Sequence, residues 1–255
     1  MTPLGPATTR SALLAAANSI LQPERFKDYG PNGLQVEGRN DIRRLVTGVT
    51  ASLALIEAAI EAKADAILVH HGLFWRGQDA CVTGWMKQRL QRLLTHDVSL
   101  FAYHLPLDAE PVWGNNARIG QLFGWQCDAH FGDQQLGCIA DANFSTLTEL
   151  AERVKQTFRR TPVVVAGEPQ RPIRRVAWCS GGAQSYFEDA IAAGADVFLT
   201  GELSEPQTHY ARECGVAYVA AGHHATERYG VQALGLVLAR ELGIQHEFID
   251  IDNPA

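Results

Sequence analysis

The sequence is poor in cysteine and keeps its cysteines far apart. Only 5 occur in 255 residues, at Cys81, Cys127, Cys138, Cys179 and Cys214. Their number is odd, and no two of them form a C-x-x-C pair. Neither a disulfide framework nor a thiolate zinc knuckle is therefore indicated. We expect a chain that works in the reducing cytosol.

Long apolar runs are also missing. No stretch reaches the roughly 18 apolar residues that a membrane span needs, so no membrane partner is expected. Residues 11–21 come nearest, but Asn18 and Ser19 interrupt them and no small-residue cleavage site follows. We interpret this stretch as an amphipathic first helix rather than as a secretory signal.

Positive charge is in the minority, and the usual phosphate loop is absent. Lys and Arg number 22 against 28 Asp and Glu, a formal charge of −6, so bulk attraction to nucleic acid does not follow. Arginines at 159–160 and 171–175 leave a local nucleic-acid contact open, although such clusters are more typical of a solvated face. No G-x-x-x-x-G-K-[ST] motif occurs, and Gly181-Gly182 is more typical of a tight turn than of a phosphate site.

What is present is the composition and rhythm of a folded α/β protein. Hydrophobic residues make up 46% and charged residues 20%, and the length suits one large or two modest domains. A turn-rich loop at 29–36 precedes an expected strand at 44–50, a helix at 53–63 and a strand at 66–69. A helix at 83–96 and a strand at 98–103 follow. This alternation predicts parallel strands with helices on their faces.

An internal repeat divides the chain into two related parts. Residues 42–69 align without gaps on residues 173–200, and ten of these 28 positions are identical. A fixed register over this length favours duplication. We therefore expect two related α/β domains, each a mostly parallel sheet flanked by helices, at 1–126 and 127–255. The segment 127–170 is expected to be a short strand-helix-strand insertion, and the C-terminal part is expected to pack on the first domain.

Residue types that bind metal ions follow three of the expected strands. In open α/β sheets ligands bind beyond the carboxyl ends of the strands, here in the crevice between the two domains. Such convergence from a chain with 9 histidines favours a metal site of imidazole and carboxylate. The residues are His70 and His71 after the strand at 66–69, His104 and Asp108 after 98–103, and His223, His224 and Glu227 after 216–221.

The spacing of these residues suggests how they share ions. If a helix opens from Thr226 onward, His223 and Glu227 lie about one turn apart and point the same way. His70 and His71 alternate faces on an ideal strand, so both serve one centre only if the chain turns at Gly72. Two ions bridged by Asp108 would also satisfy both histidines.

Other polar residues have less certain roles from the sequence alone. His104 and His224 are the candidates for orienting a ligand or transferring a proton, with His104 the first choice. Glu202 either faces the same crevice or serves as a carboxylate at a helix N-terminus. The remaining histidines are interpreted as structural, hydrogen-bonded residues. They are His96, His130, His209 and His246.

Several motifs resemble the NIF3-like family, whose members are commonly labelled GTP cyclohydrolase 1 type 2 homologues. They are Tyr29-Gly-Pro-Asn-Gly-Leu-Gln-Val-Glu-Gly38, Val69-His-His-Gly-Leu-Phe-Trp75, His104-Leu-Pro-Leu-Asp108, Gly114-Asn-Asn116, Thr200-Gly-Glu202 and Gly222-His-His-Ala-Thr-Glu-Arg228. The resemblance implies two metal ions held by His70, His71, Asp108, His223 and Glu227. It also implies a toroidal homohexamer, a trimer of dimers, and suggests a role in nucleotide metabolism or DNA-damage tolerance. The large insertion of some relatives is absent here.

The expected function is that of a dinuclear metal-dependent hydrolase. Two divalent ions, with Fe, Zn, Mn, Ni and Mg all suited to such ligands, would lower the pKa of a bound water. The resemblance makes GTP or a related, damaged nucleotide the substrate. The alternative is a non-catalytic metal-binding scaffold or a metal carrier. A catalytic site keeps open coordination positions, and five ligands for two ions favour catalysis.

Overall fold

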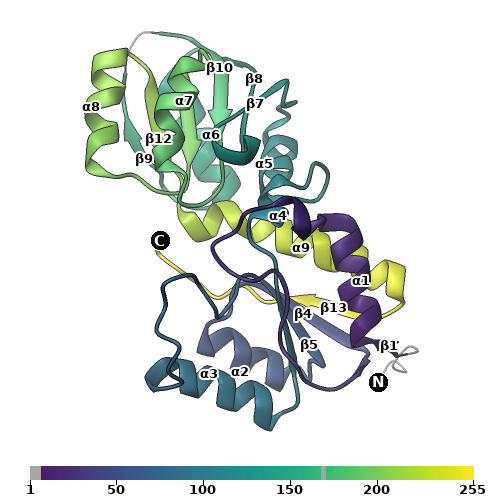
Figure 1. The fold of residues 1–255 in the computed structure, drawn as a ribbon. Coiled ribbons are helices and arrows are strands. Elements are labelled where there is room, and N and C mark those ends of the chain that lie inside the picture. The colour runs from purple at the N-terminus through teal and green to yellow at the C-terminus, as the bar shows by residue number, and fades with distance from the viewer. Residues whose placement is uncertain (1–6, 168–170) are drawn as a thin grey trace. The chain divides into compact units, whose positions relative to one another are not determined.

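The computed structural model describes residues 7–167 and 171–255, and the chain divides into two compact units (Figure 1). Unit 1 is built from Met1–Gly114 and Gly230–Asp252, and unit 2 from Asn115–Tyr229 and Asn253–Ala255. This division differs from the expected one, because the first boundary falls at 114/115 rather than at 126/127. Residues 230–252, which the expected boundaries assign to the second domain, lie in the first unit, on which the C-terminal part was expected to pack. Residues 168–170 of the expected insertion lie outside the described residues.

Local contacts explain both differences. Helix α5 (Asn115–Phe123) belongs to unit 2 because the Asn116 side chain donates to the Leu136 carbonyl and accepts from the Ser180 N–H, while Trp178 Nε1 donates to the Asn116 carbonyl. Strand β13 (Gln245–Phe248) belongs to unit 1 because it pairs in parallel with β4 (Arg44–Thr50).

Unit 1 contains a five-stranded sheet in the order β13-β4-β5-β6-β2. The three pairs from β13 to β6 are parallel, and only β2 pairs antiparallel. The strands not yet given bounds are β5 (Ala66–His71), β6 (Ser99–Ala102) and β2 (Gly33–Val36). The expected mostly parallel sheet is therefore present in this unit.

Helices cover both faces of that sheet (Figure 1). Apolar residues of α1 (Arg10–Leu21) and of the later part of α9 (His223–Leu242) share one core with the sheet. Those of α2 (Leu53–Glu61) and α3 (Gly84–Thr95) share a second core on the other face. The remaining elements are β1 (Thr8–Thr9), β3 (Asp41–Ile42), the 3-10 turn η1 (Pro23–Arg25) and α4 (Leu105–Ala109).

Unit 2 contains a six-stranded sheet that is mixed rather than mostly parallel. Its order is β7-β8-β10-β11-β12-β9, and only β10-β11 and β11-β12 pair in parallel. The segment 127–167 supplies the three antiparallel strands, which is why the expectation of a mostly parallel second sheet was wrong. Bounds are β7 (Ala129–Phe131), β8 (Gly137–Phe144), β9 (Val163–Val165), β10 (Ile173–Trp178), β11 (Val197–Thr200) and β12 (Ala217–Ala220).

The helices of unit 2 also flank their sheet. Ile119 of α5 and Leu150, Val154 and Phe158 of α6 (Leu147–Phe158) pack with the sheet in one buried core. Phe187 of α7 (Phe187–Ala192) stacks against Phe198 with ring centroids 6.0 Å apart. Helix α8 (Glu205–Cys214) precedes β12, and short 3-10 turns occur at η2 (Asp133–Gln135) and η3 (Gln184–Tyr186).

Most expected elements lie within a few residues of their predicted positions, with two informative exceptions. Strand β4 and the start of α2 match the prediction. Strand β5 continues through His70 and His71 instead of ending before them. Helix α9 begins at His223 rather than at Thr226. Among the helices described, none is both long enough and apolar enough to cross a bilayer.

The two repeated stretches fold alike at the point where their sequences agree. Asp65 Oδ2 accepts hydrogen bonds from the backbone N–H groups of Arg43 and Arg44, at 2.8 and 3.0 Å. Asp196 Oδ2 accepts from those of Arg174 and Arg175, at 2.7 and 2.9 Å. In each unit the aspartate therefore ties the start of the first strand of the repeat to the start of the second. The common origin of the two stretches stays a prediction.

We expect Asp196→Ala to destabilise unit 2 strongly. The substitution removes a buried carboxylate that accepts two backbone hydrogen bonds and pairs with Arg171 Nη2 at 2.5 Å. Each hydrogen bond to a charged group contributes about 1.5–3 kcal/mol, so loss of the two should lower the free energy of unfolding by ~3–6 kcal/mol. Urea denaturation followed by tryptophan fluorescence measures this. The exposed Asp189→Ala in α7 should cost less than about 1 kcal/mol, and equal losses would contradict the assigned role.

Candidate metal centre

His70 lies at the buried end of β5 and is held in one orientation. Its Nδ1 donates to the Tyr103 carbonyl at 3.0 Å, because a carbonyl can only accept. Its Nε2 lies 3.6 Å from Oδ1 of Asp108 in α4. The side chains are 0% and 10% exposed. A histidine whose second ring nitrogen is fixed by a carbonyl is the arrangement found at metal ligands.

His71 and His104 lie beside His70 in the same unit. The His70 and His71 rings are 4.6 Å apart between centroids, and His70 and His104 are 5.0 Å apart. One ring nitrogen from each of the three histidines lies within 4.8 Å of the others. His71 Nδ1 is 3.2 Å from Thr50 Oγ1 on β4. The two consecutive histidines are therefore brought together despite the alternation of an ideal strand.

Asp28 is a member of this group that sequence reasoning missed. His104 Nδ1 donates to Asp28 Oδ1 at 2.7 Å, and Asp28 Oδ2 accepts from Asn32 Nδ2 and the Leu105 N–H, both at 2.9 Å. Burial of the Asp28 carboxyl opposes ionisation, but the hydrogen bonds from His104 and Asn32 outweigh it and lower its pKa. The available signal was the position of Asp28 directly before the turn at 29–33.

His223, Glu227 and Glu202 form a second group, in unit 2. His223 and Glu227 lie one turn apart on α9, with Nε2 3.2 Å from Glu227 Oε1. His223 Nδ1 lies 2.6 Å from Oε1 of Glu202, in the loop before α8. Glu202 thus faces the histidine, which resolves the two alternatives left open by the sequence. Burial of the ring lowers the pKa of His223, but the two carboxylates outweigh it and raise that pKa to about 9. The site favours a positive charge.

Gly181 leaves room for this second group. Its φ is +65°, and a Cβ there would lie 3.0 Å from His223 Nε2 and even closer to the Glu227 carboxylate. Its N–H donates to Thr226 Oγ1 at 2.9 Å, which ties the turn to α9. The glycine pair is therefore the tight turn that its sequence suggested, and it also makes space for two candidate ligands.

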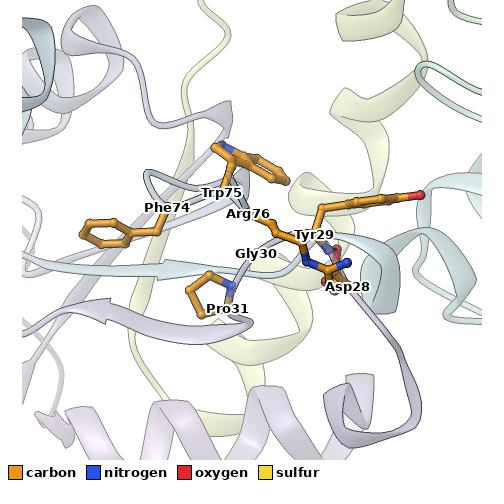
Figure 2. A pocket seen from close by; sticks show the side chains of 7 residues that line it. All are labelled: Asp28, Tyr29, Gly30, Pro31, Phe74, Trp75 and Arg76. Atoms are coloured by element: carbon orange, nitrogen blue, oxygen red, sulfur yellow. Dashed lines mark hydrogen bonds between the residues drawn. The ribbon is translucent and has the colours of Figure 1, made fainter. Parts of the chain in front are cut away.

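A hollow of ≈ 320 Å³ lies in unit 1 between the loops 28–31 and 74–76 (Figure 2). Tyr29, Trp75 and Arg76 line it, and the Arg76 N–H donates to the Tyr29 carbonyl at 2.7 Å. A smaller neighbouring hollow is shared by Trp75, His70 and His104. A Cβ on Gly30 would strike the Phe74 carbonyl oxygen, so this loop pairing needs glycine there. The hollow therefore lies beside the histidine group.

Comparison with known proteins places the chain in a family. The family model Duf34/NIF3 (NGG1p interacting factor 3) matches residues 8–254. The chain belongs to this family. A Neisseria meningitidis serogroup A protein, named GTP cyclohydrolase 1 type 2 homolog, is 51% identical over 96% of this chain and 99% of its own. A Pseudomonas aeruginosa protein of the same name is 50% identical over 96% and 98%.

Solved structures of Duf34/NIF3 relatives have the same fold. The protein ybgI, described as of unknown function, superposes with a TM-score of 0.93 at 41% identity, covering 97% of this chain and 100% of its own. TTHA1606 from Thermus thermophilus superposes with a TM-score of 0.86 at 31% identity, covering 97% and 100%. The resemblance inferred from the sequence motifs is confirmed.

The donors of this Duf34/NIF3 chain suit a divalent metal. Imidazole and carboxylate groups are the ligands that zinc, iron, manganese and nickel accept. In unit 1 the structure brings together His70, His71, His104 and Asp108, and in unit 2 His223 and Glu227. His224 is the next residue of α9, about 100° around the helix from His223, and its N–H donates to the Ala255 carbonyl. Its catalytic role stays a prediction.

The remaining histidines fall into two classes. His209 Nε2 lies 2.8 Å from Glu205 Oε1 one turn earlier on α8, and His246 Nε2 lies 2.9 Å from Thr47 Oγ1. The contacts of His209 and His246 agree with the structural roles expected for them. His96 is the exposed residue that follows α3, and its role stays a prediction. His130 differs, because it lies between Cys127 and Cys138.

Proposed function

We propose that this chain is a dinuclear metal-dependent hydrolase acting on GTP or a related, damaged nucleotide. The supporting observation is that in each unit one histidine has a hydrogen-bond acceptor on its Nδ1 and a candidate carboxylate ligand beside its Nε2. His70 lies between the Tyr103 carbonyl and Asp108, and His223 between Glu202 and Glu227. Outer partners of this kind fix the orientation and basicity of metal-binding histidines.

The residues that would hold the ions are His70, His71 and Asp108 of unit 1 and His223 and Glu227 of unit 2. We propose that these five residues would hold two ions, with Asp108 as a carboxylate ligand. Zn²⁺, Fe²⁺, Mn²⁺, Ni²⁺ and Mg²⁺ are the divalent ions to test. Bound there, they would supply a nucleophile at neutral pH by lowering the pKa of water.

His104 would transfer the proton in this proposal. Its Nδ1 is engaged by the Asp28 carboxylate, so Nε2 is the ring nitrogen that would exchange a proton with the reacting group. The hydrogen bonds that lower the pKa of Asp28 keep its carboxylate charged, so it stays an acceptor for His104 Nδ1. His224 is the second candidate for this role.

The hollow between loops 28–31 and 74–76 is where we propose that the substrate base lies. Its ≈ 320 Å³ is within the range of small-ligand sites, and the Tyr29 and Trp75 rings offer flat apolar faces to a heterocycle. The exposed Arg76 guanidinium could reach a phosphate group. The name shared by the Neisseria and Pseudomonas relatives supports GTP as the first substrate to test.

The deciding experiment is metal analysis followed by turnover. Protein purified without chelators is analysed for metal per chain, then native and reconstituted samples are incubated with GTP and assayed for formate. About two ions per chain with metal-dependent formate release would support the proposal, since one hydrolysis at C8 opens the guanine imidazole ring and a second releases C8 as formate. Two ions without turnover of GTP or other nucleotides, or loss of the fold on chelation, would favour the scaffold or carrier function. Absence of metal after every reconstitution would contradict both.

His71→Ala should reduce the metal content while leaving the protein folded. The side chain is half-buried at the end of β5, and its loss removes one imidazole donor without disturbing the buried His70. Elemental analysis and circular dichroism measure the two effects. The exposed His96→Ala, in the same unit, is the matched control and should keep the full metal content. An unchanged metal content in His71→Ala would exclude His71 as a ligand.

A further inference from the structure

Two cysteines and a histidine meet at the β7-β8 hairpin of unit 2, apart from the elements that carry His223 and Glu227. His130 of β7 pairs directly with Cys138 of β8 in antiparallel register. Side chains of directly paired residues project from the same face of a sheet. Cys127 precedes β7, and the Asp128 N–H donates to the Ile139 carbonyl at 3.0 Å, which fixes this end of the hairpin.

The three side chains have the spacing of a metal-binding set. His130 Nδ1 lies 3.9 Å from Cys127 Sγ and 3.8 Å from Cys138 Sγ, and the three ligand atoms lie within 4.8 Å of one another. Tetrahedral zinc, with Zn–S of about 2.3 Å and Zn–N of about 2.0–2.1 Å, separates its S and N ligands by ~3.6 Å and two sulfurs by ~3.8 Å. The two distances from His130 Nδ1 to the cysteine sulfurs are within about 0.3 Å of the S–N value of ~3.6 Å.

We propose that Cys127, His130 and Cys138 form a binding site for a thiophilic divalent cation, with Zn²⁺ as the preferred ion. Two thiolates and an imidazole are the donors that favour zinc over magnesium or manganese. Cys127 and His130 are exposed and Cys138 is buried, so an ion can enter from solvent while one ligand stays fixed in the core.

The surroundings support this site. A hydrogen bond with Cys138, together with the charge of His130, outweighs burial and lowers the pKa of the Cys127 thiol to about 6, while the same hydrogen bond and burial raise the pKa of Cys138. Asp128 pairs with Arg175, at 2.5 and 2.9 Å, so its carboxylate is already engaged and is not counted as a fourth ligand. Three protein ligands leave one coordination position for water.

Cobalt substitution tests the site independently of the proposed hydrolase centre. None of His70, His71, Asp108, His223 and Glu227 carries sulfur, so a sulfur-to-cobalt charge-transfer band reports cysteine ligation and not the hydrolase centre. The full chain is stripped of metal, kept reduced with a phosphine, and titrated with Co²⁺. We expect the band to saturate at one equivalent per chain, and Zn²⁺ to erase it.

Matched variants identify the ligands. Cys127→Ser should abolish the band and weaken Zn²⁺ binding at this site more than about 100-fold, beyond the 10–100-fold that loss of an outer partner costs. Cys214→Ser, at an exposed cysteine on α8, should keep the band. His130→Ala should weaken the band. Because His130 is exposed, this variant avoids the disturbance of the core that replacing the buried Cys138 would risk.

Several results would overturn the proposal. They are the absence of a band in reduced protein, an equal loss in Cys214→Ser and Cys127→Ser, or a Cys127–Cys138 disulfide that persists under reductant. Asp108→Asn should keep the band in full, whether or not the hydrolase proposal holds. Loss of the band in Asp108→Asn would assign the signal to another part of the chain and would also contradict the site.

Discussion

Asp108→Asn is expected to lower the affinity of the proposed hydrolase centre for divalent ions more than about 100-fold and to remove metal-dependent turnover with it. Asp108 is 7% exposed, and its Oδ1 lies 3.6 Å from His70 Nε2. An asparagine keeps the size of the side chain but loses the negative charge and one of the two acceptor oxygens. Removing a direct ligand should exceed the 10–100-fold effect of losing an outer partner.

The measurement is isothermal titration of metal-free protein with Zn²⁺ and Mn²⁺, together with formate release from GTP. Asp41→Asn, at an exposed carboxylate on β3 of the same unit, is the matched control and should bind as the unsubstituted chain does. The melting temperature gives a second readout, because an ion that binds only the folded state stabilises it. Ions that still raise the melting temperature of Asp108→Asn fully would exclude Asp108 from the centre.

The unit 1 group could be predicted because its residues lie at the ends of strands or shortly after them. The rhythm of apolar and polar residues located β4, β5 and β6, and parallel strands bring their carboxyl ends to one edge. His70, His71 and Asp108 could then be grouped without knowledge of any side-chain contact. The structure adds the contact from His70 to the Tyr103 carbonyl, which depends on side-chain orientation and has no sequence signature.

Asp28 was missed for a different reason. It lies in a loop, and the histidine that it holds is 76 positions later in the chain. Loop conformation depends on backbone contacts such as that between the Arg76 N–H and the Tyr29 carbonyl, which periodicity does not report. A carboxylate beside a turn is usually a turn residue, so the sequence pattern alone favoured that interpretation.

The start of α9 and the cysteine cluster also depend on information that a linear pattern lacks. Gly222 precedes His223, and no Ser, Thr, Asp or Asn stands there to mark a helix start, so Thr226 seemed the first helical residue.

Cys127, His130 and Cys138 are spaced by three and eight residues, unlike a C-x-x-C pair. Only the hairpin register, which pairs His130 with Cys138, brings them together.

Gly181→Ala should disable the unit 2 ligands although it changes no ligand. A Cβ at this position would lie 3.0 Å from His223 Nε2 and 2.9 Å from Glu227 Cδ. The ligand side chains would therefore have to shift away from the new methyl group. The φ of +65° adds a cost of roughly 1–2 kcal/mol for a residue with a Cβ. We expect metal affinity to fall more than about 100-fold, beyond the effect of losing an outer partner.

Gly194→Ala separates the steric effect of the new Cβ from the cost of left-handed backbone. Gly194 has a φ of +84° in the same unit, but a Cβ there meets no atom within 4 Å. The repeat places Lys63, with a φ of +59°, at the equivalent position, so a side chain is compatible with this turn. In urea denaturation of chelated protein both alanine variants should lose roughly the 1–2 kcal/mol that left-handed backbone costs, and Gly181→Ala should lose more because its Cβ displaces Glu227. Only Gly181→Ala should lose metal in titration calorimetry. Equal metal binding by the two variants would mean that His223 and Glu227 hold no ion, and would leave the unit 1 histidines as the whole centre.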